Sequence, residues 1–436
     1  TDLTQFKRWY SQSGTPIVCV KQSSINNKQT KFTFTQINQA TADQGSKKEL
    51  YVPIKLEVFN SLGDKLATNL VDDTLVLEGA TASITVNETS EKLTPSLLQD
   101  FSAPVIIDYE YSLKQLLCIL KYASNDYAKW EAAQNAYQFL VKQVYTDSEN
   151  NDRSYEKSLD SIAEAIIDLN VENEVLSEIL AFPSTESLII QIEEVDPIRL
   201  HEVRQSLMKY FAKTIAPFCK QRYMELSASS ILYAYEKQQV NDRRLKNTCL
   251  QILAYCPCDI TMNWIRIQFE NAQNMTDRLA ALKAADIASY DLFCDMMMKF
   301  EHTFGHDPVV MDKWFAMHAK AQKQDILAHL DLLQAHRQYS MKNPNKVRSL
   351  IGTFAFYNTL GFHQVNGAGY VYLTNYLMEL DSINPQVASR LVTPLIQFSR
   401  YAKANQELMK AQLHRLYGVK GLSRDLFEKI SKALSV

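Results

Sequence analysis

The stretch NPNKVRSLIGTF at residues 343–354 shares its opening Asn-Pro step with NPQVASRLVTPL at residues 384–395. Asn is favoured at the N-cap of a helix because its side chain accepts a hydrogen bond from a backbone N–H group. Pro is favoured at the first helical position because the N–H group that it lacks would have no partner there. Each stretch therefore predicts the start of a helix.

Each of these predicted helices carries an arginine one to two turns after its start, Arg348 in the first and Arg390 in the second. A helix start already carries partial positive charge, so a cation there is mildly unfavourable unless an anion lies opposite it. Gln386 precedes Arg390 by four residues and therefore shares its helix face. Together with backbone donors, these side chains predict a site for a carboxylate or phosphate. The pattern by itself favours the alternative, in which the arginines are solvated or pair with nearby acids.

The helical pattern extends far upstream of these two stretches. No glycine occurs from residue 80 to residue 304, which favours helices over strands, because the turns between strands usually need glycine. Apolar residues recur at helical spacing from Leu200 to Ile215, and Asn274 precedes another such segment. Prolines punctuate this half at Pro183, Pro197, Pro217, Pro257, Pro308, Pro344, Pro385 and Pro394. We predict an α-superhelical (solenoid-like) array of helices over residues 112–436, without a strict repeat.

Upstream of the helices, residues 15–111 have the period-two pattern of strands. Apolar and polar residues alternate in short runs at residues 15–22, 31–37, 52–58, 74–77, 84–86 and 105–111. Turn-forming residues separate these runs. We therefore predict a small antiparallel β-sandwich ahead of the helical domain.

The composition is that of an ordinary globular protein, with 436 residues, 46% hydrophobic and 22% charged, and a net charge of −3. This balance gives no reason to expect a nucleic acid or an anionic membrane as partner. Residues 331–436 carry an excess of 7 basic residues, whereas residues 111–330 carry an equal excess of acidic ones. The two segments either dock on each other or line a polarised cavity.

The cysteines and the hydropathy favour a cytoplasmic protein. Seven cysteines at irregular spacing predict reduced thiols rather than a disulfide framework. Cys256-Pro257-Cys258 is too closely spaced for a standard zinc knuckle. No apolar run is long enough to predict a membrane span, and we expect no signal peptide.

The motifs of common hydrolases are absent or incomplete. A zinc peptidase needs HExxH, with two histidines on one helix face and a glutamate between them. His201-Glu202 lacks the second histidine. His302 and His306 have the right spacing, but no glutamate lies between them and Gly305 disfavours a helix there. We predict no catalytic residue and no metal site in this chain.

Six segments, including the two quoted above, occur in an informative order along the chain. They are TDLTQFKRWYSQSGTP (1–16), FSAPVIIDY (101–109), NMTDRLAAL (274–282), VMDKWF (310–315), NPNKVRSLIGTF (343–354) and NPQVASRLVTPL (384–395). Taken together, they resemble the C-terminal half of the bacterial aminopeptidase N family, which belongs to the zinc-dependent gluzincin aminopeptidases. Any single match would be weak, but six in order are specific, and the resemblance covers nearly the whole chain.

The resemblance implies a domain plan. In the family, a catalytic domain with HExxH precedes a small β-sandwich and a large helical domain that caps the active-site cavity. Residues 1–14 then correspond to the exit segment of the catalytic domain, residues 15–111 to the β-sandwich and residues 112–436 to the helical cap. We expect the catalytic half to lie outside this chain, and with it the zinc ion and the general base.

The resemblance also implies a role for Arg348, Gln386 and Arg390. In the family, the matching positions face the internal cavity and help to hold the peptide beyond the scissile bond, or free amino acids. We expect the two guanidinium groups to bind a substrate carboxylate or backbone carbonyls, without taking part in the chemistry. The implied partners are the chain's own N-terminal catalytic half and its peptide substrates.

Three hypotheses follow. The first is a non-catalytic half of a zinc aminopeptidase, which should expose an apolar or aromatic patch near residues 1–14 where the catalytic domain docks. The second is a free-standing α-solenoid that binds a protein or peptide on its concave face. A third, an enzyme of unrelated chemistry, has no constellation of residues in its support.

Overall fold

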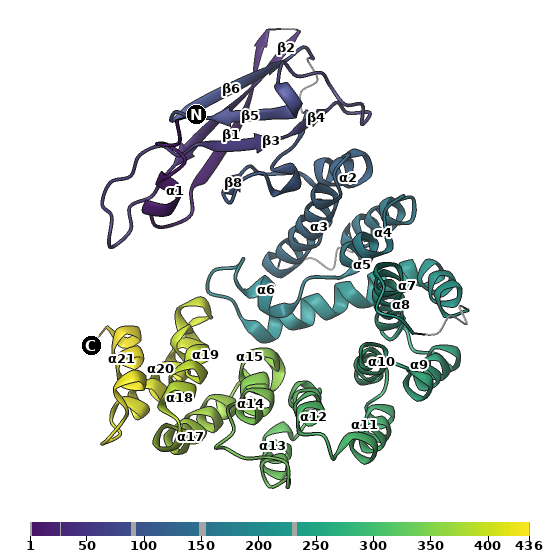
Figure 1. The fold of residues 1–436 in the computed structure, drawn as a ribbon, viewed down its shortest axis with the longest axis vertical. Helices are drawn as coiled ribbons and strands as arrows, with labels where there is room; N and C mark the ends of the chain where they lie inside the picture. The colour runs from purple at the N-terminus through teal and green to yellow at the C-terminus, as the bar shows by residue number, and fades with distance from the viewer. Residues whose placement is uncertain (1, 27, 89–92, 148–153, 229–232, 436) are drawn as a thin grey trace. The chain divides into compact units, whose positions relative to one another are not determined.

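The computed structural model describes residues 2–26, 28–88, 93–147, 154–228 and 233–435 (Figure 1). The chain forms two compact units, Thr1–Phe139 with Lys157–Ala181 and Leu140–Glu156 with Phe182–Val436. The predicted fold class, a small β domain followed by a large helical domain, is confirmed. The predicted domain limits at residues 14 and 111 stay predictions, because the compact units follow contacts rather than the change from strands to helices.

The strands of the first unit form small sheets around one apolar core. The largest sheet pairs β6 (Thr81–Val86), β2 (Gln29–Ile37), β1 (Ile17–Asn26) and β8 (Ile106–Asp108) in that order, and smaller sheets pair β3 (Val52–Lys55) with β5 (Thr74–Leu77) and β4 (Glu57–Phe59) with β7 (Thr94–Ser96). The predicted alternation is confirmed in β2, where Phe32 and Phe34 are fully buried and the residues next to them in the strand are half-buried. Both phenylalanines belong to the core cluster that the sheets share.

The strands depart from the sequence prediction in two details. β8 pairs in parallel with β1, with Ile106 opposite Ile17, whereas the other strand pairs in the described residues are antiparallel. The run at residues 52–58 breaks at Leu56 into β3 and β4, and the alternation ends there because all three residues of β4 are buried. The remaining short elements of this unit are α1 (Arg8–Ser11), η1 (Val71–Asp73) and η2 (Gln99–Phe101).

The buried residue of β4 that carries a charge is Glu57, and its carboxylate is fully hydrogen-bonded. It accepts bonds from the backbone N–H of Ser124 at 3.1 Å, from the Ser124 hydroxyl at 2.7 Å and from Gln99 at 2.6 Å. Lys65 completes the set at 3.0 Å. Burial raises the pKa of Glu57, but these bonds outweigh burial and lower it. The carboxylate thus fastens the strands to the start of α3 (Asp126–Thr146).

The first unit also takes in the earliest helices, and the second unit is helical. The early helices are α2 (Leu113–Tyr122), α3, α4 (Ser154–Ile167) and α5 (Asn173–Leu180), and α6 (Thr185–Ile189) is the first helix that lies wholly within the second unit. They are followed by α7 (Pro197–Ser227), α8 (Lys237–Leu253), α9 (Asp259–Asn271), α10 (Met275–Ala288), α11 (Tyr290–Phe304), α12 (Pro308–Lys320) and α13 (Ile326–Gln334). The last are α14 (Pro344–Val347), η3 (Arg348–Gly352), α15 (Thr353–Tyr357), α16 (Thr359–Phe362), α17 (Ala368–Ile383), α18 (Pro385–Leu391), α19 (Thr393–Ile396), η4 (Phe398–Arg400), α20 (Lys403–Tyr417) and α21 (Arg424–Leu434). Most successive helices from α7 onward contact each other.

The helix α7 confirms one prediction and corrects another. Leu200, Phe211 and Ile215 are fully buried, as the helical spacing predicted. Pro217, however, lies inside α7 instead of ending it. A proline there removes one backbone hydrogen bond and usually bends or breaks a helix. Buried side chains on both sides of it, such as Ile215 and Cys219, offset that loss through packing.

Candidate anion-binding site

Both predicted helix starts are confirmed. Asn343 is the N-cap of α14, and its side chain accepts a hydrogen bond from the backbone N–H of Asn345 at 3.0 Å. Asn384 caps α18 in the same way and accepts from the backbone N–H of Val387 at 3.2 Å. Since these side chains already satisfy a backbone donor at each start, fewer donors are left for an anion.

Arg348 begins the π-helical segment η3, which connects α14 to α15 without a break. Its side chain is exposed, and Nη1 donates a long hydrogen bond to Oδ1 of Asn345 at 3.3 Å. The hydroxyl of Thr353 donates to the backbone carbonyl of Arg348 at 3.3 Å. Single π turns inside helices occur frequently at functional sites, so the local geometry supports Arg348 as a candidate.

Gln386 and Arg390 lie on α18, and both side chains are exposed. Arg390 occupies the last turn of this seven-residue helix, where its charge complements the helix dipole. Arg348, in contrast, lies one turn into the continuous helix formed by α14, η3 and α15, close to its start. The case for an anion site depends on the exposed guanidinium groups themselves.

The segments that carry the two arginines are neighbours. A Cβ atom added to Gly352 would lie 3.8 Å from Cβ of Arg348 and 3.9 Å from Cδ1 of Leu391, the residue after Arg390. Within the described ranges, neither arginine forms an ion pair with an acidic residue. The alternative in which Arg348 and Arg390 pair with nearby acidic residues is therefore not supported. Contact of the two arginines with a ligand stays a prediction.

Sequence reasoning missed Lys346, which positions this region. Its side chain is buried, and its ammonium group pairs with the carboxylate of Asp312 at 2.6 Å and donates to the backbone carbonyl of Pro308. The same group lies over the ring of Phe315, 5.5 Å from the ring centroid. These three partners belong to α12, so Lys346 fixes α14 on α12 two residues before Arg348. The sequence did contain a signal for this ion pair, because Asp312 and Lys346 both lie in segments that carry the family resemblance.

Of the histidines in the incomplete zinc motifs, His201 is half-buried, whereas His302 and His306 are exposed. His201 lies 3.3 Å from the hydroxyl of Thr185, and burial, followed by the charge of Arg204, lowers its pKa. His302 is in the last turn of α11, and Gly305 ends that helix, so His306 lies outside it. No group of three or more potential metal ligands occurs in the part of the chain that the structure covers.

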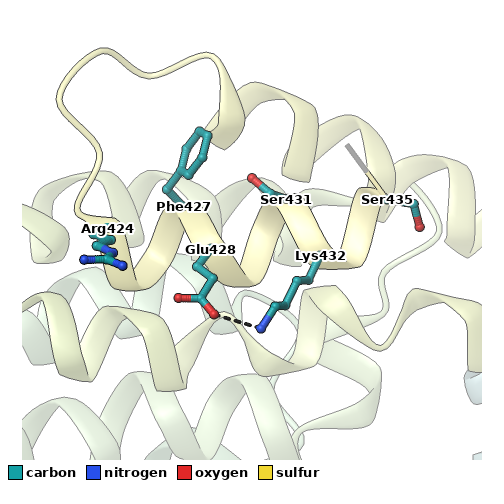
Figure 2. Close-up of a pocket in the computed structure, with 6 residues that line it drawn as sticks. All are labelled: Arg424, Phe427, Glu428, Ser431, Lys432 and Ser435. Carbon is teal, nitrogen blue, oxygen red and sulfur yellow. Dashed lines mark hydrogen bonds and ion pairs between the residues drawn. The ribbon is translucent and has the colours of Figure 1, made fainter. Parts of the chain in front are cut away.

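A surface hollow along α21 is not an alternative anion site. It is lined by Arg424, Phe427, Glu428, Ser431, Lys432 and Ser435 (Figure 2). Glu428 and Lys432 form an ion pair at 2.8 Å across one turn of the helix, so part of the positive charge is already neutralised. The hollow follows a single exposed helix face, and it lacks polar groups converging from several elements.

The fold defines the class of this protein: a small immunoglobulin-like β domain followed by a large domain of ARM-like helical repeats. Residues 113–435 match a family model described as a domain of unknown function, DUF3458_C, with ARM repeats. Residues 14–110 match the companion model, DUF3458, which has an Ig-like fold. The chain therefore belongs to the DUF3458 family.

Relatives of this chain carry the name Aminopeptidase N. The chain is 36% identical to Aminopeptidase N of Escherichia coli, with 100% of this chain and 50% of that protein covered. It is 37% identical to Aminopeptidase N of Haemophilus influenzae, with 99% and 50% covered. A crystal structure of Legionella pneumophila aminopeptidase A in complex with aspartic acid matches with a TM-score of 0.84 at 25% identity, over 100% of this chain and 50% of that one.

The chain thus spans about half the length of the relatives that it matches. The resemblance to the C-terminal half of aminopeptidase N-like proteins is confirmed. None of the helices in the described ranges combines the length and apolar character that crossing a membrane requires.

Proposed function

We propose that this chain is the non-catalytic C-terminal portion of a zinc metalloaminopeptidase that removes N-terminal amino acids from peptides. The observation that carries this proposal is the alignment of the whole chain with half of proteins named Aminopeptidase N, at 36% and 37% identity. In this proposal the helical domain closes the active-site cavity and contributes to peptide binding. The zinc ion and the groups that cleave the peptide bond belong to the N-terminal catalytic half.

The proposed task of Arg348, Gln386 and Arg390 is to hold the peptide. All three side chains are exposed on neighbouring segments of the helical unit, and the two guanidinium groups have no acidic partner among the described residues. A planar guanidinium group binds a carboxylate through two parallel hydrogen bonds, which fixes orientation as well as affinity. The amide of Gln386 adds a donor and an acceptor for the peptide backbone.

The proposed contact with the catalytic half lies near the start of the chain. Leu3, Phe6 and Tyr10 are 50%, 46% and 83% exposed, as predicted for a surface that another domain covers. The rings of Phe6 and Tyr10 pack edge to face with centroids 5.9 Å apart. Trp9 turns inward and donates from Nε1 to the backbone carbonyl of Tyr51 at 3.0 Å, which anchors the segment on the β domain.

The experiment is to assay the purified chain with aminoacyl substrates, with and without added zinc, alone and mixed with the N-terminal half of the E. coli relative. We expect no hydrolysis by the chain alone. The mixture should hydrolyse the substrates in a zinc-dependent way, at a higher rate than the N-terminal half assayed by itself. Zinc-dependent turnover by the chain alone, after contamination has been excluded, would contradict the proposal.

The ARM-repeat description of residues 113–435 favours one other candidate, a free-standing helical module that binds a protein or peptide. The mass of the mature protein distinguishes the two. A polypeptide mass near the 49.9 kDa of this chain, measured under denaturing conditions, supports the free-standing module, and a mass roughly double supports the aminopeptidase.

A further inference from the structure

The turn between α8 and α9 carries two cysteines that are separated by a single proline, Cys256-Pro257-Cys258. Cys256 is half-buried, whereas Pro257 and Cys258 are exposed. The turn lies outside the candidate anion-binding site and far along the chain from residues 1–14. A pair of neighbouring thiols, one of them accessible to solvent, is the reactive arrangement in proteins that exchange thiols with disulfides.

The covalent geometry of the turn keeps the two cysteines within reach of each other. Consecutive Cα atoms are about 3.8 Å apart, so the Cα atoms of Cys256 and Cys258 are at most about 7 Å apart. Disulfides join Cα atoms that are separated by about 4.4–6.8 Å. The backbone at Cys258 is extended, with φ −145° and ψ 168°, and the ring of Pro257 restricts the torsion between the two cysteines. A disulfide between Cys256 and Cys258 therefore requires only a local movement.

Cys258 is placed to react first. It is the N-cap of α9, and its Sγ lies 3.4 Å from Oγ1 of Thr261, whose side chain is fully buried. This hydroxyl is able to donate a hydrogen bond to the sulfur atom once the thiol has lost its proton. The hydroxyl of Thr261, followed by the backbone N–H groups of Thr261 and Ile260, lowers the pKa of Cys258. The exposed thiol is thus also the one that becomes a nucleophilic thiolate more readily.

Cys256 is held against the neighbouring helix behind this exposed thiol. Its Sγ lies 4.0 Å from the backbone carbonyl oxygen of Lys209 on α7. Burial raises the pKa of Cys256, although the charges of Lys213 and Lys220 on the same helix oppose this. Cys256 therefore remains a protonated thiol under conditions in which Cys258 ionises. The two cysteines differ in the way that an attacking and a resolving thiol differ.

The remaining cysteines lack this combination of exposure and a neighbouring thiol. Among the seven cysteines, all of which lie in the described ranges, Cys258 alone is exposed. Cys219 and Cys249 are fully buried in α7 and α8. Cys118 is half-buried, and burial raises its pKa. Reactivity toward a disulfide in solution should therefore be concentrated at the turn between α8 and α9.

We propose that Cys256 and Cys258 form a thiol–disulfide exchange site that reacts with disulfides of low molecular mass. This inference goes beyond the proposed function and does not depend on it. An exchange site needs an accessible nucleophile and a second thiol that is able to reach it, and this turn provides both.

The proposed reaction has two steps. The thiolate of Cys258 first attacks one sulfur atom of the substrate disulfide, so a mixed disulfide forms and one substrate thiolate leaves. The thiolate of Cys256 then attacks Sγ of Cys258, which closes the protein disulfide and releases the second substrate thiolate. The two protein thiols give up two protons, and the two departing thiolates take up two. The protein pair is oxidised, and the substrate disulfide is reduced to two thiols.

The test is to incubate the reduced chain with oxidised glutathione at neutral pH, quench with acid and block free thiols with N-ethylmaleimide. Mass spectrometry then measures the peptide that contains residues 256–258. We expect this peptide to lose two hydrogen atoms and escape alkylation, and dithiothreitol to restore both thiols. Cys256→Ser should stop after the first step, with one glutathione on Cys258. Cys258→Ser should react at least about tenfold more slowly, because the remaining thiol is half-buried and less acidic.

The matched control is Cys118→Ser, which removes a half-buried thiol that has no cysteine within two residues. It should leave the reaction of residues 256–258 unchanged, and circular dichroism checks that each variant is folded. The proposal would be overturned if the unsubstituted chain accumulated glutathione on Cys258 without closing the protein disulfide. Reaction of Cys258→Ser as fast as the unsubstituted chain would also overturn it, as would modification of Cys118 at the same rate as Cys258.

Discussion

Arg348 and Lys346 are two residues apart, yet their surroundings give them opposite roles. Lys346 is 3% exposed and pairs with Asp312, whereas Arg348 is exposed and has no acidic partner among the described residues. A buried charge must be paired because its desolvation otherwise costs several kcal/mol, as a general estimate. An exposed charge carries no such requirement and is available to a ligand. Substitution of Lys346 should therefore affect folding, and substitution of Arg348 or Arg390 should affect binding.

At this scale we predict the effect of Arg390→Ala in an enzyme reconstituted with a catalytic half. KM for peptides should rise by about threefold to tenfold, with kcat less altered, because the substitution removes an interaction shared by the ground state and the transition state. Steady-state kinetics measures both constants. Arg415→Ala, at an exposed arginine of α20, is the matched control and should change neither. A loss in kcat at unchanged KM would contradict the proposed role.

At the scale of elements, α12 and α13 are joined by a cluster of histidines. Nε2 of His329 lies 3.1 Å from Nδ1 of His318, and Trp314 packs between His318 and His336, with ring centroids 4.3 Å and 5.2 Å away. His336 also bonds to the carboxylate of Glu301 at 3.0 Å. Hydrogen bonds within the protein engage both ring nitrogens of His329 and His336 and Nδ1 of His318, so the cluster joins the helices.

This cluster predicts acid sensitivity. Burial, followed by the charges of His329, Lys323 and His336, lowers the pKa of His318 to about 3, and burial and Lys323 lower that of His329 to about 4. The unfolded chain, with histidine pKa values near 6.5, binds more protons than the folded chain between about pH 6.5 and pH 4. Stability is therefore full above pH 6.5 and falls as the pH is lowered through this window.

Urea unfolding at pH 7.5 and at pH 5 checks the sign. We expect the free energy of unfolding to fall by about 1–2 kcal/mol for each of the two histidines between these pH values, as an upper range. His318→Gln should lose less stability over the same interval than the unsubstituted chain. His302→Gln, at an exposed histidine of α11, should behave like the unsubstituted chain. If the unsubstituted chain, His318→Gln and His302→Gln lose the same stability between the two pH values, the assignment of the acid sensitivity to the buried histidines is wrong.

At the scale of the whole molecule, the exposed Leu3, Phe6 and Tyr10 predict association. An apolar patch at a surface that normally contacts another domain tends to find a substitute partner when that domain is missing. We expect the chain alone to self-associate as its concentration is raised, which sedimentation velocity measures. Phe6→Ser/Tyr10→Ser should shift it toward the monomer, and Val365→Ser, at a position 89% exposed in the helical unit, should not. A strictly monomeric unsubstituted chain would count against this surface.

The sequence was informative where a pattern is local. The Asn-Pro steps predicted the starts of α14 and α18, Asn274 predicted that of α10, and the alternation around Phe32 predicted β2. It was misleading where packing decides. Pro217 lies within α7, and β8 pairs in parallel with β1, because contacts remote in sequence outweigh local preference.

For the candidate site, too, the sequence predicted some features and the tertiary structure decided the others. Residue types and their order along the chain were enough to single out Arg348, Gln386 and Arg390 and to indicate the family. Capping and hydrophobic period depend on nearby residues, and the order of motifs is visible in the sequence itself. Only the tertiary structure placed Lys346 against Asp312 and exposed the two arginines beside Gly352. Burial and charge proximity depend on which helices pack together, and that packing is set by side-chain contacts between segments that no local pattern specifies.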